Sequence, residues 1–251
     1  MSYNPYSLER KSILVTGASS GIGQAIAIEC SKLGANVIIT ARNAKRLNDT
    51  FSKLEGDKKN HLQIITDLTK EDEIIYLVSQ LPKLDGCVNN AGIVKLIPTQ
   101  FISSKEIENI HQVNLIAPML LTKYLVRKKI MNNPSSIVFT SSVSGVYRVS
   151  IGNSIYATSK CGIDAFMRTA ALELAPKGIR CNSVNPAMVE TKILDRGQLT
   201  IAQYDEDRKK YPLGRYGTPV DVAYAVIFLL SDASSWITGS DIKIDGGITL
   251  N

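Results

Sequence analysis

The sequence has few of the residues on which metal sites and disulfide frameworks depend. It contains two histidines, His61 and His111, and four cysteines that never form a CxxC pair. Neither residue type stands at a metal-ligand spacing, which disfavours a zinc centre and a Ser-His-Asp hydrolase, and we predict no bound metal. The cysteines stand among apolar or small residues, a setting that favours buried free thiols over disulfides.

Long apolar runs and long basic runs are also missing. The longest uncharged apolar helix that we expect, Val222–Leu230, is too short to span a bilayer, and the N-terminus lacks the apolar core of a signal peptide. The net charge is +6, but the densest basic clusters are short, Arg127–Lys129 and Arg208–Lys210. We interpret both clusters as solvated helix ends. The sequence therefore predicts a cytoplasmic protein that binds neither nucleic acid nor a membrane.

What the sequence does contain is an alternation of short β-branched runs with helical patterns. The predicted strands are Ser12–Val15, Asn36–Thr40, Leu62–Thr66, Gly86–Asn89, Ser136–Thr140, Arg180–Val184 and Asp241–Ile244. Several are nearly continuous apolar runs, as expected for strands covered on both faces. This alternation predicts an α/β fold, a doubly wound (Rossmann-type), mostly parallel seven-stranded sheet with helices on both faces. No repeat or linker divides the chain, so we predict a single domain over residues 1–251.

One late helix has a clear start signal. Thr218 can cap it, Pro219 fits its first turn, and the carboxylate of Asp221 faces the positive end of the helix.

One segment, residues 188–213, departs from the alternation. It follows the carboxyl end of a predicted strand, where ligands of such sheets bind, and it carries mixed charge. We interpret it as a substrate lid within the domain, and the alternative is a solvated connection.

A glycine-rich stretch follows the first predicted strand and leads directly into a helix. It reads Thr16-Gly17-Ala18-Ser19-Ser20-Gly21-Ile22-Gly23. Glycines let the backbone turn sharply and approach a pyrophosphate, whose charge the helix N-terminus then favours. A glycine pattern alone would also describe a simple turn, but the strand–loop–helix context makes this one informative. We therefore predict a dinucleotide-binding loop here.

A tyrosine and a lysine stand four residues apart on a later predicted helix, so Tyr156 and Lys160 share a face. A free tyrosine has a pKa of about 10. Lowering it by about three units needs roughly 4 kcal/mol, which one ammonium about 4 Å away can supply at an effective dielectric constant of about 20. The pair is a candidate general acid/base unit. Without other motifs in the sequence, the two residues would be interpreted as an exposed Tyr and an exposed Lys on a surface helix.

Further short motifs follow the remaining strands in order. They are Asp67-Leu68-Thr69, Asn89-Asn90-Ala91-Gly92, Val113-Asn114-Leu115, Ser141-Ser142, Tyr156-Ala157-Thr158-Ser159-Lys160, Asn185-Pro186-Ala187-Met188-Val189-Glu190-Thr191 and Asp245-Gly246-Gly247. With the glycine loop, this set resembles the short-chain dehydrogenase/reductase family in its roughly 250-residue form. The resemblance covers essentially the whole chain, and the nearest-looking subgroup is the 3-oxoacyl-acyl-carrier-protein reductases.

The resemblance implies hydride transfer between a ketone and a secondary alcohol. Tyr156 would exchange a proton with the substrate oxygen, and Ser142 would hydrogen-bond that oxygen. Lys160 would lower the pKa of Tyr156 and hold the nicotinamide ribose, and Asn114 would anchor a water that links Lys160 to solvent. The implied cofactor-binding residues are Gly17, Ser19, Ser20, Gly21, Ile22, Gly23, Arg42, Asp67, Leu68, Asn90, Ala91, Gly92, Tyr156, Lys160, Val189 and Thr191.

The sequence departs from the family pattern before the tyrosine. Ser142 precedes Tyr156 by fourteen positions, one more than expected, so the loop Val143–Ile155 is predicted to bulge. Ser141 and Ser144 are alternative partners of the tyrosine, and alignment of the motif favours Ser142.

The choice of cofactor is expected to be made at the end of the second strand. Enzymes that use NAD generally place an acid there to bind the ribose 2′-hydroxyl. This sequence has Ala41 followed by Arg42. A guanidinium can bind a 2′-phosphate through two hydrogen bonds, which predicts NADP(H). An exposed loop arginine is the alternative.

The leading interpretation is an NADP(H)-dependent oxidoreductase whose carbonyl substrate is a small molecule or is bound to a carrier. Sugars, polyols, steroids and other small ketones are alternatives to a 3-oxoacyl group. A non-catalytic NADP(H)-binding sensor or scaffold is an alternative of a different class, and the intact Asn–Ser–Tyr–Lys set argues against it. The resemblance also implies a homotetramer or a homodimer.

Overall fold

The sheet of the computed structural model, which describes residues 4–191 and 201–250, has seven strands in the order β3-β2-β1-β4-β5-β6-β7. Every pairing between neighbours is parallel. The strands are β1 (Ser12–Thr16), β2 (Asn36–Ala41), β3 (Leu62–Ile65), β4 (Leu84–Asn89), β5 (Met131–Thr140), β6 (Ile179–Pro186) and β7 (Asp241–Ile244). The predicted fold class is confirmed, and β5 begins earlier than predicted.

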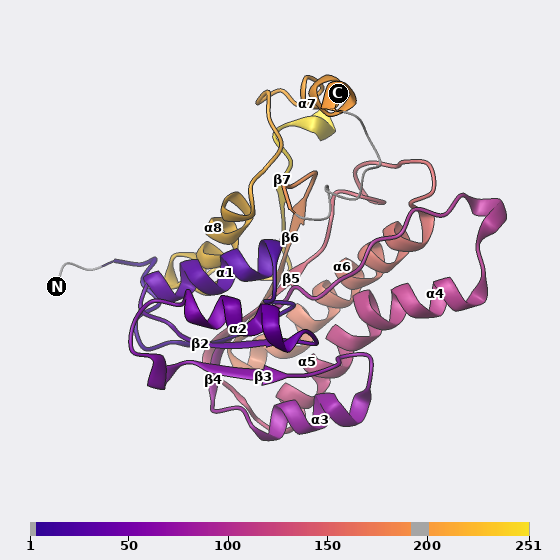
Figure 1. Ribbon diagram of the computed structural model, residues 1–251. Coiled ribbons are helices and arrows are strands. Elements are labelled where there is room, and N and C mark those ends of the chain that lie inside the picture. Colours follow the sequence, from indigo (N-terminus) through magenta and orange to yellow (C-terminus); the bar gives the residue numbers. More distant parts are fainter. Residues whose placement is uncertain (1–3, 192–200, 251) are drawn as a thin grey trace.

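Helices cover both faces of the sheet (Figure 1). One layer holds α1 (Gly21–Lys32), α2 (Ala44–Ser52) and α8 (Pro219–Leu230), and the other holds α3 (Glu71–Ser79), α5 (Ala117–Arg127) and α6 (Ser154–Leu174). The helix α4 (Ser104–His111) lies against α6. The short helix α7 (Ile201–Arg208) stands at the top of Figure 1, beyond the two layers.

The side chains of β1 show how the sequence makes two cores. Ile13 and Val15 are fully buried in the same cluster as Ile26 of α1, whereas Leu14, between them, is buried with Leu121 of α5. Alternate residues of a strand point to opposite faces, so a continuous apolar run fills both layers. Each such side chain contributes roughly 2 kcal/mol to folding by leaving water.

The start of α8 is held by a capping box. The Thr218 hydroxyl accepts from the backbone N–H of Asp221 at 3.3 Å, and the Asp221 carboxylate accepts from the N–H of Thr218 at 2.6 Å. Arg215 donates to the same carboxylate at 2.7 and 3.0 Å. The predicted cap is confirmed.

Replacing Thr218 by Ala is expected to lower the free energy of unfolding by about 1 kcal/mol, because it leaves a helix-start N–H without its acceptor. Urea denaturation would measure this loss. Thr218→Ser keeps the hydroxyl and should lie close to the wild type. Equal losses in both variants would contradict a capping role for the hydroxyl.

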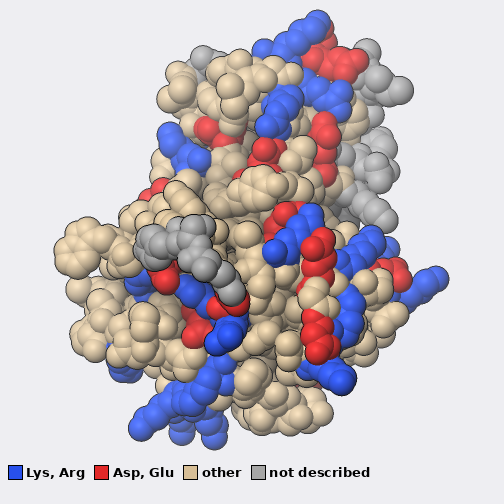
Figure 2. Space-filling model, turned by 90° about the vertical axis from the view of Figure 1, so that its left-hand side faces the viewer, with Lys and Arg blue, Asp and Glu red and all other residues tan. Residues whose placement is uncertain are grey.

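The basic clusters lie at helix ends, as predicted. Arg208, Lys209 and Lys210 each pair with the acidic residue three positions earlier. On the face drawn in Figure 2, uncharged residues cover most of the surface, and basic and acidic side chains stand near one another in several places. Within residues 4–191 and 201–250 no group of His, Cys, Asp and Glu could hold a metal ion, and no helix is long and apolar enough to cross a membrane.

The predicted lid lies only partly within the described residues, because 192–200 fall outside them. Before this stretch, Val189 pairs with Gly217 through an isolated bridge. After it, Tyr211 and Tyr216 are buried against Ile248 near the C-terminus. Both flanks of the segment are therefore anchored to the domain, and lid movement stays a prediction.

Candidate active site

The glycine loop between β1 and α1 lies against the end of β4. Gly17 has a φ of +64°, and a Cβ there would stand 2.7 Å from the Cα of Ala91. A Cβ on Gly23 would stand 2.4 Å from Nδ2 of Asn90 and 2.5 Å from the carbonyl oxygen of Gly17. Side chains cannot fit at these distances, so both glycines are required by the close approach of two backbone segments.

The N-terminus of α1 leaves its backbone donors open to a ligand. Ser20 is the N-cap but makes no side-chain cap, and the first turn contains no acidic residue. The first N–H groups of a helix carry a partial positive charge and bind anions when no side chain satisfies them. This end of α1 therefore fits the pyrophosphate of a dinucleotide.

Thr16 fixes the end of β4 beside this loop. Its hydroxyl accepts from the backbone N–H groups of Asn90 and Ala91 at 2.9 and 3.1 Å and donates to the carbonyl of Val88. Thr16 was not among the predicted site residues. Its position at the end of a strand, directly before the glycine loop, could have identified it as a site residue.

Tyr156 and Lys160 lie on the first turns of α6, as predicted. The Lys160 ammonium stands 5.6 Å from the centroid of the Tyr156 ring, and it donates to the carbonyl of Thr140 at 2.7 Å. Lys160 is only 4% exposed. A Cβ on Gly92 would stand 3.5 Å from this ammonium and 3.4 Å from Oδ1 of Asn114. The site is thus a cluster formed by the ends of β4 and β5 and the start of α6.

Asn114 lies in a π-helical turn, Gln112–Ile116, between α4 and α5. Its amide accepts from the N–H of Ile93 at 2.8 Å and donates to the carbonyl of Ile93 and to the Ser159 hydroxyl. The wider turn has a local cause, because Pro118 has no N–H to donate to the Asn114 carbonyl four residues earlier. Wide turns of this kind often mark functional sites. The sequence predicted an ordinary helix here.

The three candidate serines have different partners. The Ser141 hydroxyl lies between the carbonyl of Lys160 at 3.1 Å and the carboxylate of Asp164 at 2.9 Å. The Ser144 hydroxyl accepts from the amide of Asn153. Of the three, Ser142 is the serine whose hydroxyl acts on the Tyr156 phenol and lowers its pKa, and the same hydroxyl accepts from the N–H of Ser144 at 3.1 Å. The geometry therefore favours Ser142, as the sequence did.

The pKa of Tyr156 differs from the expectation. Although the residue is half-buried as a whole, its phenol group is desolvated, which raises the pKa above its usual value, and only the hydrogen bond with Ser142 opposes this rise. Burial also lowers the pKa of Lys160 to about 8. Desolvation is the largest influence on the pKa of both groups, and the lowering of the Tyr156 pKa by Lys160 stays a prediction.

Arg42 is the first residue after β2 and is exposed. Partial burial pushes the pKa of Asp67 upward, but hydrogen bonds from Thr69 and the charge of Arg42 outweigh it and lower that pKa. Arg42 and Asp67 therefore lie close enough to interact across the ends of β2 and β3. Arg42 itself forms no ion pair within residues 4–191 and 201–250.

The remaining predicted residues border the same space. A Cβ on Gly21 would meet the Thr191 methyl at 3.2 Å, so the residues after β6 reach the glycine loop. Val189 is buried in the α1/α8 core, and Leu68 packs against the other core. The structure thus brings the predicted set together along the carboxyl ends of β1 to β6.

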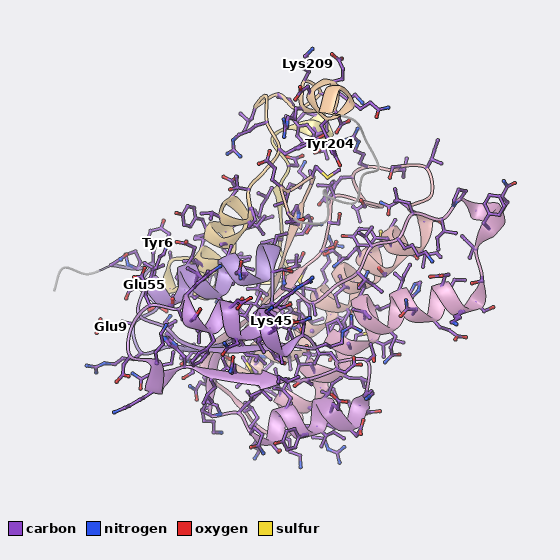
Figure 3. The ribbon with its side chains drawn as sticks, in the orientation of Figure 1. Tyr6, Glu9, Lys45, Glu55, Tyr204 and Lys209 are labelled. Atoms are coloured by element: carbon purple, nitrogen blue, oxygen red, sulfur yellow. The ribbon has the colours of Figure 1, made fainter. Side chains whose placement is uncertain are left out.

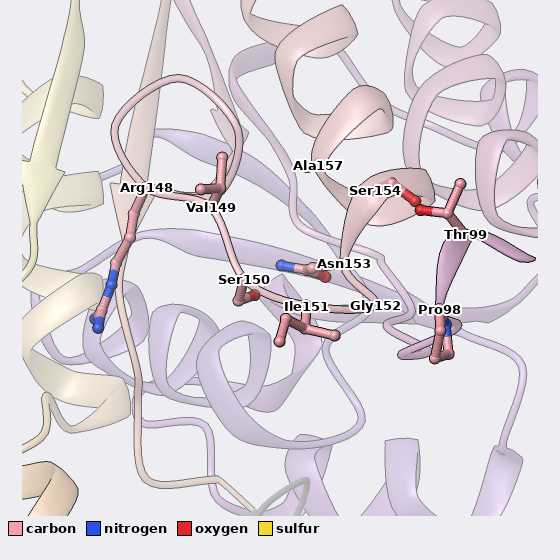
Figure 4. Close-up of a pocket in the computed structure, with 10 residues that line it drawn as sticks. All are labelled: Pro98, Thr99, Arg148, Val149, Ser150, Ile151, Gly152, Asn153, Ser154 and Ala157. Atoms are coloured by element: carbon pink, nitrogen blue, oxygen red, sulfur yellow. The ribbon is translucent and has the colours of Figure 1, made fainter.

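A pocket of about 320 Å³ opens at the start of α6, where Ser154 and Ala157 line it (Figure 4). Its walls come from Pro98 and Thr99 on one side and from the loop before α6 on the other. That loop presents Val149 and Ile151, which are 83% and 90% exposed. The N–H of Ile97 donates to the carbonyl of Gly152 at 2.7 Å and joins the two walls.

Three comparisons place these features among known proteins. A family model described as Enoyl-(Acyl carrier protein) reductase matches residues 17–249. A 3-oxoacyl-(acyl-carrier-protein) reductase of Rickettsia felis is 35% identical over 97% of this chain and 98% of its own. The crystal structure of a short-chain type dehydrogenase/reductase from Mycobacterium marinum is 32% identical, with a TM-score of 0.88 over 98% of each chain. That of an aldohexose dehydrogenase from Thermoplasma acidophilum is 30% identical, with a TM-score of 0.86 over 97% of this chain and 96% of its own.

Proposed function

The chain belongs to the short-chain dehydrogenase/reductase family, and we propose that it is an NADP(H)-dependent enzyme in which Tyr156 exchanges a proton with a carbonyl substrate. Family membership makes it an oxidoreductase acting on CH–OH groups with a nicotinamide cofactor. The observation that carries the proposal is the convergence of Ser142, Tyr156 and Lys160 at one end of the sheet. A protein that only bound and sensed the cofactor would not need this set of serine, tyrosine and lysine.

Tyr156 is a phenol, and a phenol is protonated at neutral pH, the state that proton donation needs. It can give its proton to a carbonyl oxygen as that oxygen becomes an alcohol. Ser142, which acts on the same phenol, would donate a hydrogen bond to the substrate oxygen. The Lys160 ammonium, 5.6 Å from the centroid of the Tyr156 ring, would stabilise negative charge that develops on the phenol.

The nicotinamide cofactor supplies the hydride when bound. The open N-terminus of α1, the glycine loop and the side chain of Lys160 are the groups that would hold it. Asn114 would anchor a water through its position near Lys160, since a Cβ on Gly92 would lie 3.4 Å from Oδ1 of Asn114 and 3.5 Å from the Lys160 ammonium.

The start of α2 supports NADP(H) over NAD(H). Its first turn contains no acidic residue, whereas Lys45 and Arg46 stand there and Arg42 precedes them (Figure 3 labels Lys45). Positive side chains at a helix N-terminus oppose the helix dipole. A 2′-phosphate bound among them would remove this repulsion, and an acid that would bind a 2′-hydroxyl is missing from Ala41–Asn43.

Replacing Arg42 by Ala is expected to erase most of a roughly 10- to 100-fold preference for NADPH over NADH, because one charged hydrogen bond contributes about 1.5–3 kcal/mol. Values of kcat/KM with each cofactor would measure it. NADH kinetics should stay unchanged. Lys45→Ala removes one neighbouring charge and is the matched control, with a smaller expected effect. A wild-type enzyme that prefers NADH would contradict the assignment of Arg42.

The pocket at the start of α6, where Val149, Ile151 and Ala157 line it, supports a substrate with an apolar chain. Exposed Val149 and Ile151 on its rim would lose contact with water when an acyl or alkyl group binds. We propose a 3-oxoacyl thioester, free or carrier-bound, ahead of sugars and polyols. Loss of NADPH absorbance with a panel of ketones, sugars and 3-oxoacyl thioesters tests this order. Turnover of sugars alone would contradict it, and no turnover of any carbonyl would favour the sensor alternative.

We also propose a homotetramer or homodimer. Exposed apolar side chains support self-association, among them Leu172 of α6, which is 80% exposed, and Trp236, which is 97% exposed. Such side chains are typical of surfaces that a second copy covers. Light scattering coupled to gel filtration would measure the mass, and a monomer at micromolar concentration would contradict the proposal.

A further inference from the structure

A buried carboxylate lies one helical turn beyond Lys160. Asp164 is 1% exposed, and its oxygens accept hydrogen bonds from the Ser141 hydroxyl at 2.9 Å, the Ser183 hydroxyl at 2.8 Å and the Asn185 amide at 3.1 Å. Burying a carboxylate is costly unless donors surround it. None of the ion pairs among the described residues includes Asp164. The three donors that hold this carboxyl group, two hydroxyls and one amide, are therefore all neutral.

The donors belong to the strand ends that carry the site. Ser141 directly precedes Ser142, and the Asn185 amide also donates to the Ser142 carbonyl at 3.2 Å. The Ser141 hydroxyl in turn contacts the carbonyl of Lys160. Asp164 thus accepts hydrogen bonds from both strands and joins the ends of β5 and β6 to α6. Its donors Ser141 and Asn185 both adjoin Ser142.

The charge of Asp164 also acts on Lys160. Two titratable side chains of α6 lie near this ammonium. They are Tyr156, which precedes Lys160 by one helical turn, and Asp164, which follows it by one turn. The elements packed against it provide neutral groups, the carbonyl of Thr140 on β5 and the amide of Asn114. Desolvation lowers the pKa of Lys160, and the Asp164 carboxylate opposes that fall.

We propose that Asp164 is a positioning residue that holds Ser142 in place and keeps Lys160 in its ammonium form at neutral pH. It touches neither substrate nor cofactor. The inference rests on the proposed function, since it assigns a purpose to the charge of Lys160. A carboxylate used only for packing could be replaced by an amide of the same shape with no effect on that lysine.

The experiment follows the titration of Lys160 directly. Protein containing 13C-labelled lysine is titrated by NMR, and the Lys160 resonance is assigned by its absence from Lys160→Met. In the wild type it should titrate near pH 8. In Asp164→Asn it should titrate about one pH unit lower, because the carboxyl group one helical turn away, which raises the pKa of Lys160, has been replaced by a neutral amide. The alkaline limb of kcat/KM should move by the same amount.

Ser183→Ala is the matched control, because it removes one hydrogen bond to the carboxylate but leaves the charge. It should lower the urea midpoint and leave the Lys160 titration unmoved. If Asp164→Asn does not fold, Asp164→Ser takes its place, with room for a water among the same donors. An unmoved titration in the neutral variant, or an equal shift in Ser183→Ala, overturns the proposal. The NMR titration needs no turnover, so it remains readable even if no carbonyl is reduced and the proposed function fails.

Discussion

Tyr156→Phe is expected to lower turnover at least ~100-fold, the lower end of what a general acid contributes. The substitution keeps the ring and removes only the hydroxyl that Ser142 hydrogen-bonds. NADPH binding, followed by fluorescence titration, should stay nearly unchanged, and so should the midpoint of urea unfolding. Steady-state loss of NADPH absorbance would measure the turnover.

Tyr124→Phe is the control for this result. The Tyr124 hydroxyl of α5 donates to Glu71 of α3 at 2.5 Å, and neither residue belongs to the site. Its removal should leave turnover within about twofold, because this hydroxyl contacts no residue of the site. Near-wild-type turnover by Tyr156→Phe would contradict the assignment of Tyr156 as the proton donor.

Lys160→Met is expected to lose at least as much turnover as Tyr156→Phe and, in addition, to bind NADPH about 10-fold or more weakly. The second loss follows because a charged hydrogen bond to the cofactor contributes about 1.5–3 kcal/mol. Methionine preserves the length of the buried stem without its charge. Turnover and fluorescence titration on the same preparation separate the two effects.

Lys123→Met removes an exposed ammonium from α5 and should change neither quantity, since its partner Glu71 is also exposed. If Lys160→Met lost turnover but bound NADPH normally, the lysine would act only on Tyr156. That outcome would remove its proposed contact with the cofactor and leave the acid/base assignment intact.

The strands and the order of the motifs could be predicted because their signals are local. Apolar runs such as Ile13–Val15 identify strands covered on both faces, and Gly17 and Gly23 stand in a strand–loop–helix context. The wide turn at Asn114 was missed, although Pro118 four residues later was its signal. A proline is compatible with several helix starts, so it does not by itself select a π-helical turn.

The electrostatics of the site could not be predicted from spacing. A spacing of four positions placed Tyr156 and Lys160 on one face, as observed, but spacing does not tell how far each group is removed from water. That depth decides the sign of the pKa shift of Tyr156. Asp164 was missed for a similar reason, because its donors Ser183 and Asn185 come from a distant strand.

The order of the strands in the sheet bears on how the chain is made. From β1 onward each strand pairs with one that has already been synthesised: β2 with β1, β3 with β2, β4 back with β1, and then β5, β6 and β7 each with the strand before it. Domains begin to form while their C-terminal part is still on the ribosome. No strand of this sheet must wait for a later one, so the sheet can grow by one strand at a time. The last pairing forms when Asp241–Ile244 has emerged and covers the edge of β6, which leaves β3 and β7 as the two edge strands of the sheet.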